Sequence, residues 1–330
     1  MRHFTTKERV SLANYLRIGF TYRKISKLIG KAISSISVEI NRNGGLKRYK
    51  YYEADTRAML KKYQRKKRRK KLDFSLFLKK YVIGKLRDEL SPEQISGELR
   101  VMAKGKSIIS HETIYQFIYS EEGAELGLWK HLRHRAKYKY PKRRSWSKRN
   151  GRRGPTIPNR VSIHSRPSRI DKKEEFGHWE ADLMVFPKNP NVLAVFVERK
   201  TKQTYSFVNN DKSAAQMKRA LHAFIEQAGL ENVKSITFDN GLENVCHEEV
   251  RNEYGNVFDT YFCDPYCSWQ KGLVENTNKL LRQYFPRKIL SKKLNQDRLD
   301  SVISKLNSRP RKTLQFTSPF SAFNLVRFDT

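Results

Sequence analysis

The chain has 330 residues and a strongly basic composition, which narrows its function before any motif is considered. Lys and Arg total 68 against 33 Asp and Glu, a formal net charge of +35 at pH 7. With 38% hydrophobic and 12% aromatic residues the chain can bury a core, so full disorder is excluded. No apolar run reaches the roughly 18 residues of a membrane-spanning helix, and no N-terminal apolar segment predicts secretion. Three cysteines cannot form a paired disulfide framework, so we predict a reducing, cytoplasmic compartment.

The positive charge is concentrated in the first half of the chain. Residues 1–170 hold 44 Lys or Arg and 13 Asp or Glu, whereas residues 171–330 hold 24 and 20. A basic half of this kind is typical of proteins that bind nucleic acid or an anionic membrane surface. We therefore predict a polyanion-binding first half, followed by an ordinary globular domain.

Residues 1–50 are predicted to form a helix-turn-helix DNA-binding domain. Apolar residues at helical spacing predict helices over Thr6–Ile18, Tyr22–Ile29 and Ser34–Asn41, with a glycine turn before the last helix. Small polar residues let the last helix approach base edges closely, and a basic residue on it can reach phosphate or guanine. The candidate DNA contacts on this helix are Ser34, Ser35, Ser37 and Arg42. A plain helical bundle without DNA contact is the alternative.

Residues 51–73 are predicted to continue as a basic helix and linker. The run KKYQRKKRRKK holds nine basic residues in eleven, including Arg68 and Arg69. Such a run is often only a solvated tail. Because it directly follows a helix-turn-helix, we expect these side chains to contact phosphates.

A second helical domain, resembling the first, is predicted over residues 74–130. The segment Ser91-Pro92-Glu93-Gln94 is a strong helix start, with Ser as N-cap, Pro in the first turn and Gln to close a capping box. A further helix is predicted after Ser110. This domain either reads DNA or mediates oligomerisation, and its sequence does not distinguish the two.

The composition changes twice in the remaining chain. Residues 131–172 are basic, rich in Pro, Gly and Ser and without periodicity, which predicts a linker along a nucleic-acid backbone. Residues 173–330 alternate strand and helix patterns, which predicts an α/β domain with a mixed sheet and a C-terminal helical tail. The predicted strands are His178–Phe186, Val192–Glu198, Tyr205–Asn209, Val233–Asp239 and Phe258–Phe262. The predicted helices are Ser213–Gln227, Glu248–Tyr254, Trp269–Tyr284 and Gln296–Leu306.

Three acidic residues lie at informative places in this α/β domain. Asp182 is in the first predicted strand, Asp239 ends the fourth, and Glu275 is in the first turns of an amphipathic helix. Each alone is most simply a turn, capping or surface residue. In a protein that binds DNA, carboxylates near phosphates predict hard divalent cations, because Mg²⁺ takes oxygen ligands. Two such ions can activate a water or hydroxyl and stabilise the leaving oxygen of an in-line displacement.

Other polar residues are weaker candidates. Glu180 lies on the same strand face as Asp182 and ranks second as a ligand, and Asp264 is interpreted as a turn residue. A zinc site is disfavoured because the His and Cys residues form no paired CxxC motif. The residues weighed for zinc are His131, His134, Cys263 and Cys267.

Several segments together resemble the bacterial insertion-sequence 30 family of transposases. They are HWEADLMVF at 178–186, ITFDNGLEN at 236–244, YFCDPYCSWQKGLVENTNKLLRQYFP at 261–286, RKISKLIGKAISSISVEINRNGG at 23–45 and LNSRPRKTLQFTSPFSAF at 306–323. The resemblance covers nearly the whole chain. Two departures are minor: Ala181 replaces a common Gly, and Phe238 replaces a common small residue.

The resemblance implies a ribonuclease-H-like integrase catalytic core with an Asp-Asp-Glu triad. The family's triad falls on Asp182, Asp239 and Glu275, with 35 residues between the last two. These residues would be catalytic and would hold Mg²⁺ or Mn²⁺, with two ions expected. Other residues of the helix that carries Glu275 would position DNA, namely Lys271, Asn276, Lys279 and Arg282.

The resemblance also implies a function and partners. The expected function is that of a transposase that binds the terminal inverted repeats of its own element, cleaves DNA to free a 3′-hydroxyl and joins that end to target DNA. The expected partners are double-stranded DNA and further copies of the chain, in a homodimer or higher synaptic complex at the bacterial nucleoid. The alternatives are a sequence-specific DNA-binding regulator, a catalytically decayed transposase and a metal nuclease that does not transpose.

Overall fold

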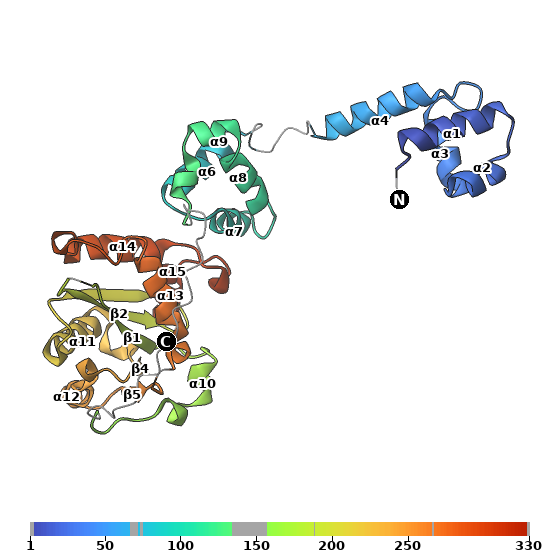
Figure 1. Cartoon of the computed structure of the whole chain (residues 1–330). Helices are drawn as coiled ribbons and strands as arrows, with labels where there is room; N and C mark the ends of the chain where they lie inside the picture. Colours follow the sequence, from blue (N-terminus) through green and yellow to red (C-terminus); the bar gives the residue numbers. More distant parts are fainter. Residues whose placement is uncertain are drawn as a thin grey trace. The chain divides into compact units, whose positions relative to one another are not determined.

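The computed structural model describes residues 3–66, 72, 75–133, 157–187, 189–265 and 267–328. The chain divides into two compact units, Met1–Leu76 and Phe77–Thr330 (Figure 1). The candidate residues Arg68, Arg69 and His134 lie outside the described residues. The finer division into five segments stays a prediction.

The first unit is helical, as predicted. Helices α1 (Thr6–Arg17), α2 (Tyr22–Ile29) and α3 (Ile33–Arg42) are followed by α4 (Tyr51–Lys66). Gly30 ends α2 with φ 70°, a left-handed conformation that glycine adopts without strain. The helices share a small core made of Leu12, Ile25, Ile36 and Ile40.

A buried ion-pair network ties the helices of this unit together. The Arg9 guanidinium on α1 lies 2.7 Å from the Glu39 carboxylate on α3 and 2.8 Å from the Asp55 carboxylate on α4. Because Arg9 is buried, it needs both acids to offset the cost of removing its charge from water. The network therefore fixes α3 relative to α1 and α4.

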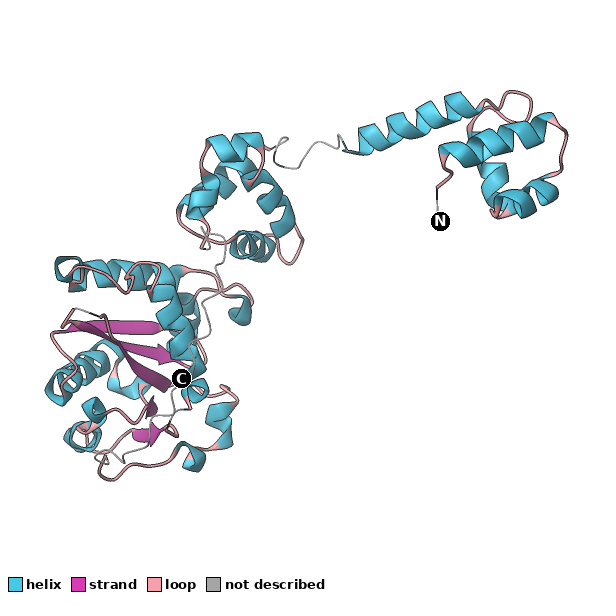
Figure 2. Cartoon of the chain, viewed as in Figure 1, coloured by secondary structure: helices cyan, strands magenta, loops and turns pink. Residues whose placement is uncertain are grey.

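The second unit begins with a helical part. It contains α6 (Leu76–Arg87), α7 (Pro92–Met102), α8 (His111–Ile118) and α9 (Glu121–Glu125) (Figure 2). The predicted capping box is present, with Ser91 and Gln94 bonded reciprocally to each other's backbone N–H groups. The Gln94 amide also donates to the backbone carbonyl of Pro310, at 2.8 Å. This part therefore contacts the C-terminal segment of the chain.

The α/β part is built on a five-stranded mixed sheet. The strands are β1 (His178–Met184), β2 (Val192–Glu198), β3 (Thr204–Asn209), β4 (Ser235–Phe238) and β5 (Asp259–Phe262). Their order is β3-β2-β1-β4-β5. The first three strands are antiparallel neighbours, and β4 and β5 run parallel to β1. The sheet is mixed, as predicted, and all five predicted strands are confirmed. The bounds of β2 match the prediction, β3 begins one residue earlier, and β1, β4 and β5 are shorter than predicted.

Helices cover both faces of the sheet. Figure 1 shows α11 (Ala214–Ala228) on one face, and α13 (Gly272–Leu281) and α14 (Gln296–Ser308) on the other. Alternate residues of β2 enter the two cores: Phe196 joins the α11 side, and Val195 joins the side of α13 and α14. Burial on both faces explains why β2 reads as an uninterrupted apolar run.

Some elements differ from the sequence-based prediction. The predicted helix Trp269–Tyr284 is a 3₁₀ turn, Ser268–Lys271, followed by the shorter α13. Tight 3₁₀ turns are frequent at helix ends, and apolar periodicity does not reveal them. The sequence-based prediction also omitted α10 (Ser168–Asp171). Helices α12 (His247–Glu253) and α15 (Pro319–Phe328) complete the domain. None of the described helices is both long and apolar enough to cross a membrane.

Candidate active site

Strand register brings the two candidate aspartates together. In the parallel pair β1–β4, Glu180 lies opposite Thr237. Asp182 lies two residues after Glu180, and Asp239 lies two residues after Thr237. Because side chains alternate along a strand, the two aspartates are opposite each other on the same face of the sheet. The end of β4 therefore presents Asp239 next to Asp182.

Lys271 lies between these two carboxylates. Its ammonium Nζ is 3.0 Å from Asp182 Oδ1 and 3.7 Å from Asp239 Oδ2, and it also donates to the Ala181 carbonyl at 2.8 Å. Only 5% of Lys271 is exposed. Burial lowers the pKa of Lys271, but the two carboxylates outweigh it and hold that pKa above its usual value. The predicted DNA-positioning lysine is thus placed as the shared counterion of both aspartates.

Asp182 is the more enclosed of the two. Burial raises the pKa of the Asp182 carboxyl, and the Lys271 ammonium opposes that shift. The Asn278 amide on α13 donates to Asp182 Oδ2 at 2.6 Å. Asp182 is therefore oriented by Lys271, at the end of the 3₁₀ turn that precedes α13, and by Asn278, on α13 one turn after Glu275.

Glu275 lines the same cavity but has a different partner. The cavity has a volume of about 310 Å³, and its walls include Asp182, Asp239, Lys271 and Glu275. The Glu275 carboxylate pairs with the Lys279 ammonium at 2.9 Å on the exposed side of α13. Within the described residues, no three His, Cys, Asp or Glu side chains are grouped closely enough to hold a metal ion as they stand.

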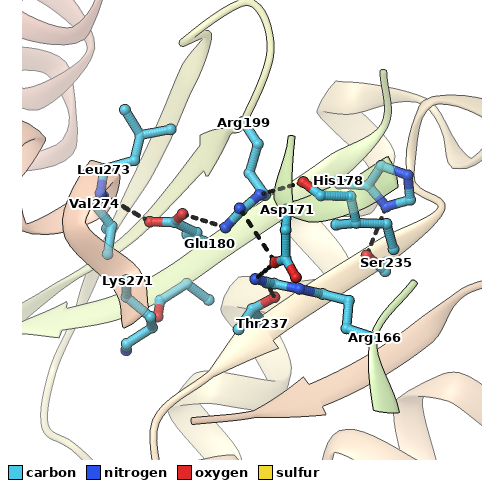
Figure 3. Close-up of polar contacts among 12 residues, drawn as sticks. Arg166, Asp171, His178, Glu180, Arg199, Ser235, Thr237, Lys271, Leu273 and Val274 are labelled. Atoms are coloured by element: carbon cyan, nitrogen blue, oxygen red, sulfur yellow. Dashed lines mark hydrogen bonds and ion pairs between the residues drawn. The ribbon is translucent and has the colours of Figure 1, made fainter. Parts of the chain in front are cut away.

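Glu180 is engaged elsewhere (Figure 3). Its Oε1 lies 2.6 Å from Arg199 Nη1, and its Oε2 accepts from the backbone N–H groups of Leu273 and Val274 at 3.1 and 3.0 Å. Glu180 therefore caps the first turn of α13, and the helix that carries Glu275 is tied to the strand that carries Asp182. This contact explains its burial without a bound ion.

A fourth carboxylate, Glu243, lies near the two aspartates and was not singled out in the sequence. Burial raises the pKa of Glu243, and the negative charges of Asp239 and Asp182 add to that shift. Its position four residues after Asp239, in the segment ITFDNGLEN, is the signal that could have identified it.

Two further candidates, the acidic Asp264 and the basic Arg282, are bound by neighbouring residues. The Asp264 carboxylate accepts from the Gln270 amide at 2.7 Å and contacts His164 Nε2 at 2.7 Å, which fixes the turn before α13. Arg282 donates to the Val185 carbonyl at 2.8 Å, and its guanidinium lies 4.6 Å from the centre of the Phe186 ring. Arg282 therefore binds the chain segment that follows β1.

The remaining candidate DNA contacts lie at the surface. Asn276 and Lys279 are exposed on α13. On α3, Ser34 and Arg42 are exposed, while Ser35 and Ser37 are partly buried. DNA contact by these residues stays a prediction.

The sequence matches known proteins over nearly its whole length. No family model matches the chain. The chain is 38% identical over 325 residues to the transposase InsI for insertion sequence element IS30C of Escherichia coli strain K12, a match that covers 96% of this chain and 82% of that protein. It is 33% identical over 327 residues to the transposase for insertion sequence element IS4351 of Bacteroides fragilis, covering 98% and 96%.

Among solved structures, the catalytic core domain of BIV integrase matches 47% of this chain and 98% of its own, with 17% identity and a TM-score of 0.38. The two sequence matches, each above 30% identity and spanning most of both proteins, decide the assignment. The chain belongs to the insertion-sequence 30 family of transposases.

Proposed function

We propose that this chain is a transposase whose reaction is carried out at the pocket lined by Asp182, Asp239 and Glu275. It would hydrolyse a phosphodiester at the end of its element and use the freed 3′-hydroxyl to attack a second phosphodiester. The observation that carries the proposal is the pair of level aspartates on neighbouring parallel strands, in a cavity that α13 closes with a third carboxylate.

The side chains present fit a hard divalent cation. Carboxylate oxygens are ligands that Mg²⁺ prefers, and Asp182, Asp239 and Glu275 bring them to the cavity. The Lys271 ammonium already lies between the two aspartates, which indicates that this position stabilises a positive charge. Two bound Mg²⁺ or Mn²⁺ ions would activate the attacking water or hydroxyl and stabilise the leaving oxygen.

The chain's own residues then have distinct roles. Asp182 and Asp239 would hold both ions, and Glu275 would complete one site by exchanging its partner Lys279. Asn278 keeps the Asp182 carboxylate oriented through a hydrogen bond that its side-chain amide donates. Lys271 remains at the floor of the pocket, where it offsets negative charge next to the reacting phosphate.

DNA recognition is assigned to the first unit. Helix α3 follows a glycine turn and presents small polar residues and Arg42 at its surface, as in recognition helices that enter the major groove. We assign to it the terminal inverted repeats of the element. Because two ends and a target must be brought together, the active form would be a dimer or a higher oligomer on double-stranded DNA.

The test uses the full-length protein and DNA that carries the element's own ends, with Mg²⁺, with Mn²⁺ or with chelator. Cleaved and joined strands are resolved on a sequencing gel. Asp182→Asn and Glu275→Gln should each abolish joining. Asp264→Asn is the matched control, because Asp264 lines the same cavity but is held by His164 and Gln270.

Each result decides between the candidate functions. Metal-dependent joined products that both triad variants lose would support the proposal. Cleaved products that are never joined would indicate a nuclease. Specific end binding without any chemistry would indicate a DNA-binding regulator or a decayed copy, and joining that survives Asp182→Asn would refute the triad.

A further inference from the structure

A second, larger cavity lies beside the catalytic pocket and has no role in the reaction described so far. Its volume is about 1220 Å³, and it is lined from α13 by Leu273, Asn276 and Leu280 among others. The catalytic pocket is lined from α13 by Val274 and Glu275, so no residue of this helix is shared. The first turns of α13 therefore separate the two cavities.

The acidic residues of this cavity are already neutralised (Figure 3). Glu180 pairs with Arg199 at 2.6 Å, and Asp171 pairs with Arg166 and lies 3.9 Å from Arg199. Two carboxylates thus offset two arginines within the cavity wall.

The other basic side chains of the wall have no such partner. The wall holds seven Arg or Lys residues and only two carboxylates. Across the described ranges, five of the seven form no ion pair with a carboxylate. They are Arg133, Lys173, Lys200, Lys202 and Arg311.

This excess of positive charge is partly desolvated. Burial, and next the charge of Lys173, lowers the pKa of Lys202 to about 8. Burial, and next the charge of Arg309, lowers the pKa of Arg311 to about 10. The Nε atom of Arg311 is buried without a hydrogen-bond partner within the described part of the chain. An anion in the cavity would relieve both the repulsion and the unmet hydrogen bond.

A large aromatic side chain stands at the same cavity. Trp269 lines it and is 72% exposed, although burying an indole is normally favourable. Exposed aromatic rings beside a basic groove are the stacking platforms on which proteins hold the bases of single strands. Such stacking needs a base that is not paired in a duplex.

We propose that this cavity binds an unpaired segment of a DNA strand, with its phosphates on the five uncompensated cations and a base stacked on Trp269. The inference rests on the proposed function, because it takes DNA as the substrate of the neighbouring pocket. Since one helix forms a wall of both cavities, the strand held here would continue from the DNA at the catalytic carboxylates. The cavity would keep that strand unpaired while its partner reacts.

Cross-linking tests where the strand lies. The full-length protein is mixed with a DNA duplex whose single-stranded extension carries 5-iododeoxyuridine, irradiated, and digested for mass spectrometry. A cross-link in the peptide that contains Trp269 is expected, and Trp269→Ala should remove it. Trp129→Ala is the matched control, because Trp129 is also exposed but does not line the cavity. Cross-links confined to residues 3–66 would overturn the proposal.

Salt dependence tests the phosphate contacts. The double variant Lys173→Gln/Lys200→Gln should bind the extension with a log–log salt slope shallower by about 1.4, at about 0.7 per phosphate contact on a single strand. Trp269→Ala should weaken binding on the order of ten-fold. Lys292→Gln/Lys293→Gln removes the same charge from exposed residues outside the cavity and should leave the slope unchanged.

The two proposals can fail separately. Wild-type joining together with unchanged slope and affinity in the cavity variants would refute the strand site and leave the transposase function intact. Lost extension binding in the cavity variants, together with undiminished joining by Glu275→Gln, would refute the catalytic triad and support the strand site.

Discussion

The Glu180→Leu substitution is predicted to destabilise the α/β domain strongly. The Glu180 and Arg199 side chains are 2% and 5% exposed and lie 2.6 Å apart. Removing one partner of a buried pair costs about 3–5 kcal/mol, because the other charge stays buried. Asp171 lies 3.9 Å from Arg199 and offsets part of this cost, so we take the lower end, about 3 kcal/mol.

The same substitution also removes a helix cap. Glu180 accepts from the first backbone N–H groups of α13, and losing a cap costs about 0.5–2 kcal/mol. The total is about 4 kcal/mol, which lowers the thermal midpoint on the order of 10 °C for a domain of this size. Urea unfolding followed by the fluorescence of Trp179, which is buried in this domain, measures the change.

A double variant tests the physical reason. Glu180→Leu/Arg199→Met removes the uncompensated charge, so it should recover about 2 kcal/mol relative to Glu180→Leu alone. A single variant that costs less than about 1 kcal/mol, or a double variant as unstable as the sum of its parts, would refute the reasoning. If Glu180 were instead a metal ligand, the stable double variant would bind DNA ends but fail to join them.

Three further predictions follow from other contacts. Lys271→Met should cost about 2–3 kcal/mol in chelator-containing buffer, because the pocket's aspartates lose their shared cation, and urea titration measures it. Burial lowers the pKa of His247, so the unfolded chain binds more protons below pH 6.5. The unfolding free energy should then fall as the pH drops below that value, and His247→Gln should reduce the fall in urea midpoints. In Gly97→Ala the new Cβ would lie 2.0 Å from the Phe316 ring, so the thermal midpoint should drop by an amount equivalent to about 1–3 kcal/mol, whereas Gly84→Ala meets nothing and should not lower it.

The sheet could be predicted because its signals are local. Strand β2, for example, is apolar from Val192 to Val197, and turn residues bound it. The proximity of Asp182 and Asp239 could not be predicted from local sequence signals, because it depends on the parallel register of β1 and β4. Before the register was known, the two residues were linked by the family resemblance and by the argument that carboxylates near phosphates indicate divalent cations.

The partners of buried charged residues could not be predicted from local sequence signals. A lysine or glutamate in a sequence is most simply an exposed residue, since such groups are almost never fully buried unless paired. Lys271 is buried against Asp182, 89 residues earlier in the chain, and Glu180 is buried against Arg199, the residue that follows β2. Neither partner is apparent from the local sequence. Helix α15 is different: Ser318-Pro319 repeats the Ser-Pro start that predicted α7, so the same rule applied there would have found it.

The position of Glu275 shows where prediction from sequence must stop. Lys271, at the end of the 3₁₀ turn before α13, and Asn278, on α13, both contact Asp182. Glu275 lies between them in the chain and lines the same pocket. Its side chain instead pairs with Lys279 at the surface, and an exposed i,i+4 pair of this kind is worth only about 0.3–0.5 kcal/mol. The backbone is therefore fixed by many contacts, whereas the carboxylate is held by one weak pair. Such a pair yields readily to a divalent cation or a phosphate, so substrate binding, rather than folding, would bring the third carboxylate to the aspartates.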